Sequence, residues 1–140
     1  MKEDVMNKLL LLIVVFLINV TPDFQAPIND YQIAENTRPS HIAWDMTSED
    51  VQVFPSAKGR VVFAGWKYNG LGNTVVISHG FGWYTYYTHL GEIYVYAGDQ
   101  ITSETSIGTI GSTGNSKALH LHFEIRRFYV SYDPSHFIAR

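Results

Sequence analysis

Residues 119–126 read Leu-His-Leu-His-Phe-Glu-Ile-Arg, in which apolar and polar side chains alternate without exception. Successive side chains of a β-strand point to opposite faces of the sheet, so this alternation predicts a strand with one buried face. The apolar face carries Leu119, Leu121, Phe123 and Ile125, and the polar face carries His120, His122, Glu124 and Arg126. Two imidazoles on one face of an anchored strand are suited to holding a metal ion or moving protons.

Glycines divide the rest of the chain into short segments. All 11 lie between Gly59 and Gly114, and they separate runs of β-branched and aromatic residues that are typical of strands. The expected strands are residues 60–64, 74–78, 83–88, 93–96, 106–110 and 119–126. Residues 79–82 and 97–100 have the composition of hairpin turns, and no stretch after residue 50 keeps a helical period over three turns. The sequence therefore predicts an all-β fold, a single compact antiparallel sheet or barrel-sandwich domain.

Length and charge restrict the function. A chain of 140 residues has room for one ordinary domain, and a net charge of −3 with scattered Lys and Arg offers no basic stripe for nucleic acid. Nucleic acid is therefore not an expected partner. The absence of cysteine excludes thiolate zinc sites and leaves His, Asp and Glu as metal ligands.

The N-terminus is an apolar run that begins at Leu9 and ends at Val20, interrupted only by Asn19. It is short for a membrane span of about 20 residues and fits the apolar region of an export signal better. We expect residues 1–20 to be a signal peptide or a retained short membrane anchor, with a buried core helix as the third alternative. Either export variant places the folded part in the periplasm, the cell envelope or the extracellular space.

The proline-containing residues 21–40 follow as an expected linker or lead-in, because they show no regular period. The folded domain is then expected at residues 41–140.

The six histidines differ in their surroundings, and a lone histidine is most often a surface or core residue. Structural roles are expected for His79 and His136. His89 ends an expected strand in which Tyr87 has the same parity, so the two side chains should project together. His41 precedes Asp45 by four residues, close enough for both to bind one ion in a turn. Two imidazoles and one carboxylate form the ligand set of an open catalytic zinc site, and two further histidines could move protons.

The order and spacing of these segments resemble the lysostaphin-like, or LytM-type, zinc metallopeptidases, which cut peptide bonds in bacterial peptidoglycan. The matching segments are residues 41–45, 72–80, 87–90, 107–116 and 120–124. The resemblance implies a substrate groove that takes peptidoglycan peptide. It also implies that His41, Asp45 and His122 hold Zn²⁺, while His89 and His120 are the catalytic pair. Which of the two is the base stays open.

Two further side chains near this expected site have open roles. Tyr87 either donates a hydrogen bond to the tetrahedral intermediate or fills the wall of the groove. Glu124 lies one step beyond His122 on the strand, so it is expected to support a ligand or to pair with a nearby arginine rather than to bind the metal itself.

Two positions depart from the family pattern. Ala43 replaces a glycine, which would cost about 1 kcal/mol if that position required a positive φ. Ala118-Leu119 replaces a Gly-Pro pair before the strand. The segment that commonly precedes the first ligand is also not recognisable, so an edge strand is expected to be missing.

Three functions are compatible with these features. The leading hypothesis is an exported zinc endopeptidase that acts on peptidoglycan stems or cross-links. The second is an inactive or weakly active binding module of the envelope that works with a regulatory protein. The third is a phosphohistidine carrier, against which Asp45 and the export signal both argue.

Overall fold

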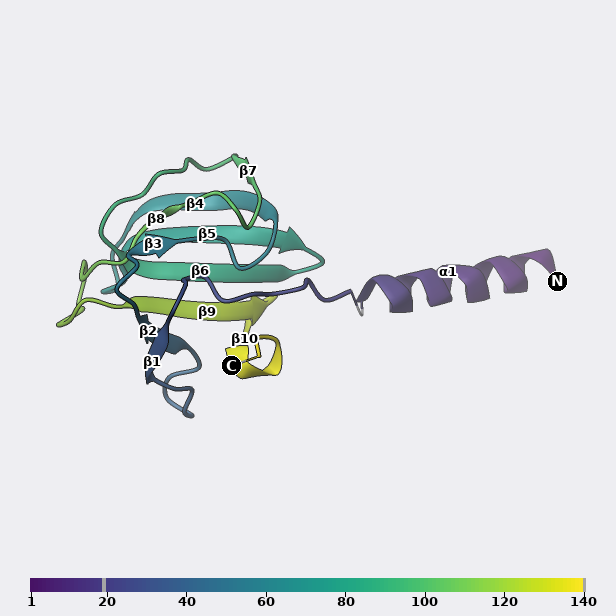
Figure 1. Ribbon diagram of the computed structural model, residues 1–140. Helices are drawn as coiled ribbons and strands as arrows, with labels where there is room; N and C mark the ends of the chain where they lie inside the picture. Colours follow the sequence, from purple (N-terminus) through teal and green to yellow (C-terminus); the bar gives the residue numbers. More distant parts are fainter. Residues whose placement is uncertain (19, 140) are drawn as a thin grey trace.

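The computed structural model describes residues 1–18 and 20–139 and combines one N-terminal helix with a β domain (Figure 1). Asn19, within the expected export segment, lies outside the described residues. The elements are α1 (Lys2–Ile18), β1 (Gln32–Glu35), β2 (Trp44–Thr47), β3 (Gln52–Val53), β4 (Gly59–Lys67), β5 (Gly72–Gly80), β6 (Trp83–Leu90), β7 (Gln100–Ile101), β8 (Gly108–Thr109), β9 (Leu121–Arg127), β10 (Val130–Tyr132) and the short 3₁₀ helix η1 (Pro134–His136).

Eight strands form one antiparallel sheet in the order β1-β2-β9-β6-β5-β4-β7, with β10 paired to β9. The expected all-β antiparallel fold is confirmed, and β3 and β8 form a small second ladder (Figure 1). A turn at Phe81 and Gly82 joins β5 to β6 where the sequence predicted a hairpin. Residues 93–96 are not a strand, because only Ile93 bridges, to Gly108, and the expected strand at 106–110 is reduced to β8.

The core lies against the face of the sheet to which β9 contributes Leu121, Phe123 and Ile125, all fully buried. These are the alternating residues that the sequence assigned to the buried face. Leu119 is the exception and is exposed, because β9 begins only at Leu121. The opposite face of β9 is left for the polar side chains.

Residues 21–40 differ from the expected linker. Phe24 and Ile28 are buried in the core, and β1 pairs with β2 as the edge strand that the sequence did not reveal. The packed domain therefore begins well before residue 41. The sequence missed this segment because its apolar residues are spaced without a period and need no regular element to reach the core.

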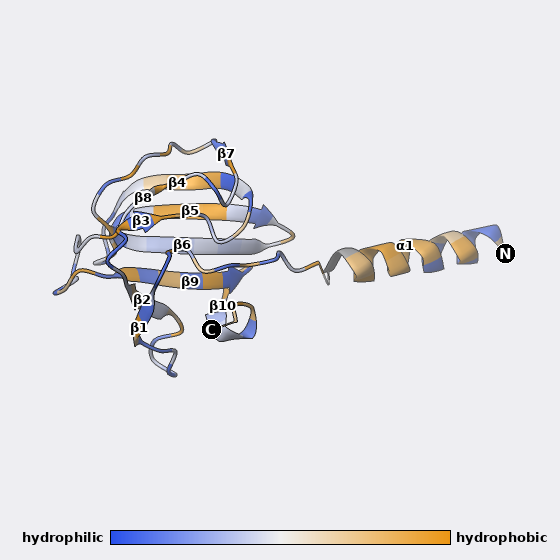
Figure 2. Cartoon of the chain, in the orientation of Figure 1, coloured by the Kyte–Doolittle hydropathy of each residue, from blue (hydrophilic) through white to orange (hydrophobic). Residues whose placement is uncertain are grey.

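Helix α1 is polar at its start and apolar from its middle onward (Figure 2). The large side chains from Leu9 to Phe16 are all exposed, which contradicts the alternative of a buried core helix. Among the residues that the structure describes, no helix has both the length and the apolar character needed to cross a membrane.

Candidate active site

Three side chains that the sequence proposed as metal ligands meet on the polar face of the sheet. Asp45 on β2 is the direct cross-strand partner of His122 on β9, and His41 lies in the segment leading into β2. Oδ1 of Asp45 is 2.8 Å from Nδ1 of His122 and 3.3 Å from Nε2 of His41. The two histidine nitrogens are 3.3 Å apart. Pairing β2 with β9 thus joins residues 77 positions apart in the chain.

This donor set fits a divalent cation. Tetrahedral zinc with bonds of about 2.0–2.2 Å requires ligand atoms about 3.3–3.6 Å apart. The two spacings from Nε2 of His41 match at 3.3 Å, and the 2.8 Å contact between Asp45 and His122 is a direct hydrogen bond that would lengthen around an ion. Burial favours neutral groups, but the hydrogen bonds to Asp45 and Glu124 outweigh it and raise the pKa of His122 to about 9. Burial is likewise outweighed at Asp45, where the three nearby histidines lower the pKa of the carboxyl. The Asp45 carboxylate therefore attracts positive charge. A bound cation would take the place of the proton in the hydrogen bond between Asp45 and His122.

Glu124 supports His122 from the side away from Asp45. Its Oε1 lies 2.9 Å from Nε2 of His122, and its Oε2 accepts hydrogen bonds from Nε of Arg126 at 2.6 Å and forms an ion pair with Nη2 at 2.5 Å. A carboxylate at the second ring nitrogen fixes the orientation and tautomer of a metal-binding histidine. The expected arginine pair is thus confirmed, and Glu124 lies outside the ligand group.

His120 faces the same group of side chains, with its Nε2 3.8 Å from Oδ1 of Asp45. Its Nδ1 lies 2.9 Å from the carbonyl oxygen of Ala118 and 3.1 Å from the hydroxyl of Ser116. Because a carbonyl only accepts, Nδ1 carries the hydrogen in that bond. In the neutral ring the lone pair is then on Nε2, directed at the site.

His89 is held in the same way from the neighbouring strand. Its Nδ1 donates to the carbonyl oxygen of Thr113 at 2.8 Å, and its ring centroid is 5.0 Å from that of His120. Burial, assisted by repulsion from His120 and His122, lowers the pKa of His89 and keeps the ring neutral near pH 7. The site therefore contains two imidazoles with basic Nε2 atoms beside three ligand atoms.

The expectation that Tyr87 projects into the site is wrong. The side chain is fully buried in the core, where its hydroxyl accepts a hydrogen bond from the backbone N–H of Ser56 at 2.7 Å and contacts the hydroxyl of Thr85. His89 adopts φ of 60°, and the β5–β6 register is irregular between Asn73 and Val75. This local break in the strand reverses the side to which residue 89 points, so the parity rule fails there.

Two supporting residues were not anticipated: Thr113 and Ser116. Thr113 is the more connected, because its hydroxyl accepts from the backbone N–H of Asn73 at 3.0 Å and donates to the carbonyl of Leu90 at 2.7 Å. It thereby fixes the carbonyl that positions His89. A threonine after a Gly-Ser pair gives no sequence signal for this role.

The histidines assigned to structural roles lie away from this site. His79 is hydrogen-bonded to the carbonyl of Lys58 at 2.8 Å and to the hydroxyl of Thr85 at 2.7 Å, and His136 is exposed on η1. Ala43 is buried and is not among the residues with positive φ, so the substitution of the family's glycine brings no backbone strain.

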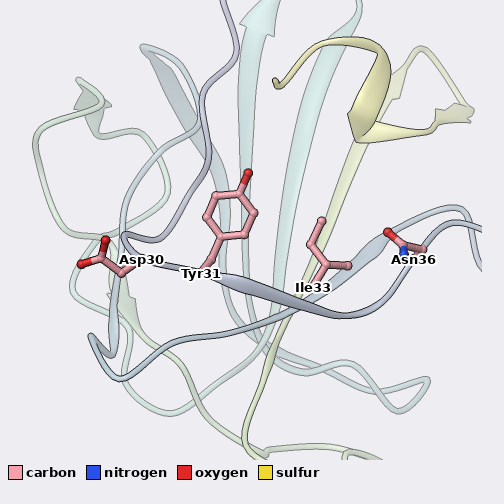
Figure 3. A pocket seen from close by; sticks show the side chains of 4 residues that line it. All are labelled: Asp30, Tyr31, Ile33 and Asn36. Atoms are coloured by element: carbon pink, nitrogen blue, oxygen red, sulfur yellow. The ribbon is translucent and has the colours of Figure 1, made fainter. Parts of the chain in front are cut away.

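Several hollows lie near the β1–β2 edge. One, of about 320 Å³, borders the ligand group and is lined by Pro39, Ser40, His41, Ile42, Ala43, His122, Glu124, Arg126 and Ser131. A larger one of about 530 Å³ is lined by Asp30, Tyr31, Ile33 and Asn36, and contains none of the site residues (Figure 3). The smaller of these two hollows is therefore the one that gives access to the ligand group.

A family model described as peptidase family M23 matches residues 40–134. This range includes all five candidate site residues, which are His41, Asp45, His89, His120 and His122. The chain belongs to peptidase family M23. The M23 domain is 36% identical over 88 residues to "Lipoprotein NlpD" of Yersinia enterocolitica, covering 63% of this chain and 90% of that protein. It is 34% identical over 93 residues to "Murein hydrolase activator NlpD" of Escherichia coli, where 66% of this chain covers only 24% of that protein.

Solved structures agree with the M23 fold. The peptidase lysostaphin of Staphylococcus simulans superimposes with a TM-score of 0.73 at 30% identity, over 84% of this chain and 53% of that one. A "zinc containing peptidase" of Vibrio cholerae superimposes with a TM-score of 0.70 at 26% identity, over 79% of this chain and 39% of that one.

Proposed function

We propose that this M23 domain is a zinc-dependent endopeptidase that hydrolyses peptide bonds in the stems or cross-links of bacterial peptidoglycan. The observation that carries the proposal is the meeting of His41, Asp45 and His122 around one point with two basic imidazoles beside it. Likeness to a zinc-containing peptidase and to lysostaphin supports the same chemistry.

Zinc would be held by Nε2 of His41, Oδ1 of Asp45 and Nδ1 of His122, and when bound it would polarise the scissile carbonyl and acidify a water molecule. His120 and His89 present their Nε2 atoms to this point. One of them takes the proton of the attacking water, and the other, in its protonated form, donates to the oxyanion or the leaving amine.

A second candidate is a non-cleaving module that activates a murein hydrolase. It is favoured by the name of the Escherichia coli relative, at 34% identity over 93 residues. In that case the envelope partner would be the hydrolase, and the metal group would stabilise the fold rather than act on substrate.

We also propose that the chain is exported to the cell envelope. Residues 1–20 would serve as a signal peptide or short anchor, consistent with the exposed apolar side chains of α1. The description of the Yersinia enterocolitica relative as a lipoprotein supports the same location.

Purified full-length chain incubated with peptidoglycan sacculi separates the two candidates. For the peptidase, we expect new amino groups to be released, the release to stop with a chelator and to return with zinc, and His120→Ala to abolish it. His136→Ala is the matched control, because His136 is exposed on η1 and should leave the release unchanged.

For the activator, the chain alone should release nothing but should increase release by an added murein hydrolase. Failure of the chain to bind zinc in equilibrium dialysis would refute the metal-dependent proposal, whatever the release.

A further inference from the structure

Two hairpin turns lie side by side at one end of the sheet. The β5–β6 turn contains Phe81 and Gly82, and the β9–β10 turn contains Phe128 and Tyr129. The backbone N–H of Phe128 donates to the carbonyl of Gly82 at 2.6 Å. The ring of Phe128 also covers Gly82 so closely that a Cβ there would be 2.5 Å from it. We call residues 81–82 and 128–130 the hairpin tips.

The hairpin tips present large apolar side chains to solvent. Phe81 is 48% exposed, Phe128 62%, Tyr129 99% and Val130 57%. Single exposed apolar residues are ordinary, but four together on two adjoining turns form a patch that marks an interaction surface.

Both phenylalanines stand where the backbone disfavours them. Phe81 has φ of 51° and Phe128 has φ of 53°. Two-residue hairpin turns with positive φ favour Asn and Gly, and a bulky side chain in that conformation is a genuine outlier. Strain of this kind persists at functional sites. Each phenylalanine therefore costs its own turn free energy relative to Asn or Gly.

The apolar helix leaves the domain at the same place. The indole Nε1 of Trp83, the first residue of β6, donates to the carbonyl of Val20 at 2.9 Å. Val20 is two positions after Ile18, the last residue of α1, and Figure 1 shows the helix extending from this end of the sheet. A cation lies there too, since the guanidinium of Arg127 is 5.1 Å from the ring centroid of Trp83 and 5.7 Å from that of Phe128.

We propose that the hairpin tips rest on a phospholipid bilayer, in the same membrane that takes up the apolar side chains of α1. Aromatic rings on a projecting surface, with an arginine beside them and an apolar helix within two residues, match the chemistry of a membrane interface. Arg127 would contact lipid phosphate while the rings enter the headgroup layer. The same patch without the helix would suit a protein partner equally, so the exit of α1 is what selects lipid.

The surface also sets the orientation of the site. His122 is the second residue of β9 and Arg127 is its last, so the ligand group and the hairpin tips lie toward opposite ends of one strand. Five residues of strand span about 17 Å. The ligand group would then lie about 17 Å farther from the bilayer than the hairpin tips.

The absence of cysteine in the chain permits a direct test. Full-length Tyr129→Cys is labelled with the polarity-sensitive fluorophore NBD and mixed with vesicles of phosphatidylcholine and phosphatidylglycerol. Tyr68→Cys is the matched control, since Tyr68 is 83% exposed but lies in the β4–β5 turn at the other end of β5. We expect NBD emission at position 129 to rise severalfold and to be quenched by brominated lipid, with no response at position 68.

A double variant separates membrane contact from folding. Phe81→Asn with Phe128→Asn relieves two positive-φ conformations, so unfolding in urea should require at least as much denaturant as for the parent chain. Its partition into the same vesicles should nevertheless fall on the order of tenfold, because two rings lose their burial in lipid. Tyr68→Asn should keep the parent partition.

An NBD label at position 129 that stays in water on the vesicle-bound chain would overturn the proposal. Parent-like partition of the double variant, or a parent chain that binds no vesicles, would overturn it as well. The proposal rests on residues 1–20 being retained as the short anchor. None of these measurements depends on peptidase activity, so the membrane surface and the proposed peptidase function fail separately.

Discussion

Glu124 should control how tightly the ligand group binds zinc, although it does not touch the metal position. Its carboxylate accepts from Nε2 of His122 at 2.9 Å and is held on its other oxygen by Arg126. Replacing it by glutamine keeps the shape and one acceptor oxygen but removes the charge that makes the imidazole a better donor to a cation. The change therefore tests the electrostatic part of the contact.

The expected magnitude follows from these contacts. Loss of a carboxylate that supports a metal-binding histidine lowers metal affinity about 10–100-fold, or about 1.4–2.7 kcal/mol. Glu124→Gln should fall at the lower limit, about tenfold, because the amide oxygen still accepts from His122. Glu124→Ala should approach about 100-fold, since the ring then loses its partner altogether. Arg126 is 31% exposed, so hydration offsets part of its lost ion pair.

Zinc affinity is measured by competition with a chromophoric chelator at pH 7.5. The control is Glu92→Gln, because Glu92 is an exposed acid whose carboxylate accepts a hydrogen bond from the hydroxyl of Tyr94 at 3.0 Å. Equal affinities for the parent chain and Glu124→Ala, with the same folded fraction by circular dichroism, would refute the argument that His122 is oriented through its second nitrogen.

Three other substitutions probe the core and one support of the site. Tyr87→Phe removes the acceptor of the Ser56 N–H and should lower the free energy of unfolding in urea by about 1–3 kcal/mol, while zinc affinity stays unchanged. A loss of zinc affinity would show that Tyr87 contributes to the metal site after all. Burial lowers the pKa of His79, so just below the ordinary pKa of about 6.5 the unfolded chain binds more protons and the folded state loses stability as pH falls. Urea titrations at pH 7 and pH 5 should show a larger loss for the parent than for His79→Asn, and equal losses would contradict this. Thr113→Val should lower the kcat of sacculus hydrolysis and change KM by a smaller factor, because it loosens the carbonyl that holds His89. A change in KM alone would argue against that role.

The sequence predicted the fold best where one rule acted alone. Alternation in β9 assigned Leu121, Phe123 and Ile125 to the core, because a regular strand in a one-sided sheet obeys period two throughout. The same rule failed from Tyr87 to His89, since the left-handed backbone at His89 interrupts the ladder. Alternation along a sequence contains no record of such a break.

The ligand group was accessible from the sequence because the resemblance to lysostaphin-like peptidases implies His41, Asp45 and His122, and these side chains do converge. The residues that hold the site in place were harder to identify. Thr113 and Ser116 act through single backbone or ring contacts whose partners are set only when distant loops come together. Glu124 is the supporting residue that the sequence did identify, because it follows His122 on the same face of the strand.

The β5–β6 and β9–β10 turns project from one end of the sheet. The five-residue separation between His122 and Arg127 along β9 sets the distance from these turns to the ligand group. A domain seated on lipid by those turns would reach only the layer of wall nearest the membrane, whatever bond it prefers. Lengthening residues 19–23 would not extend that reach while the turns stay on the bilayer.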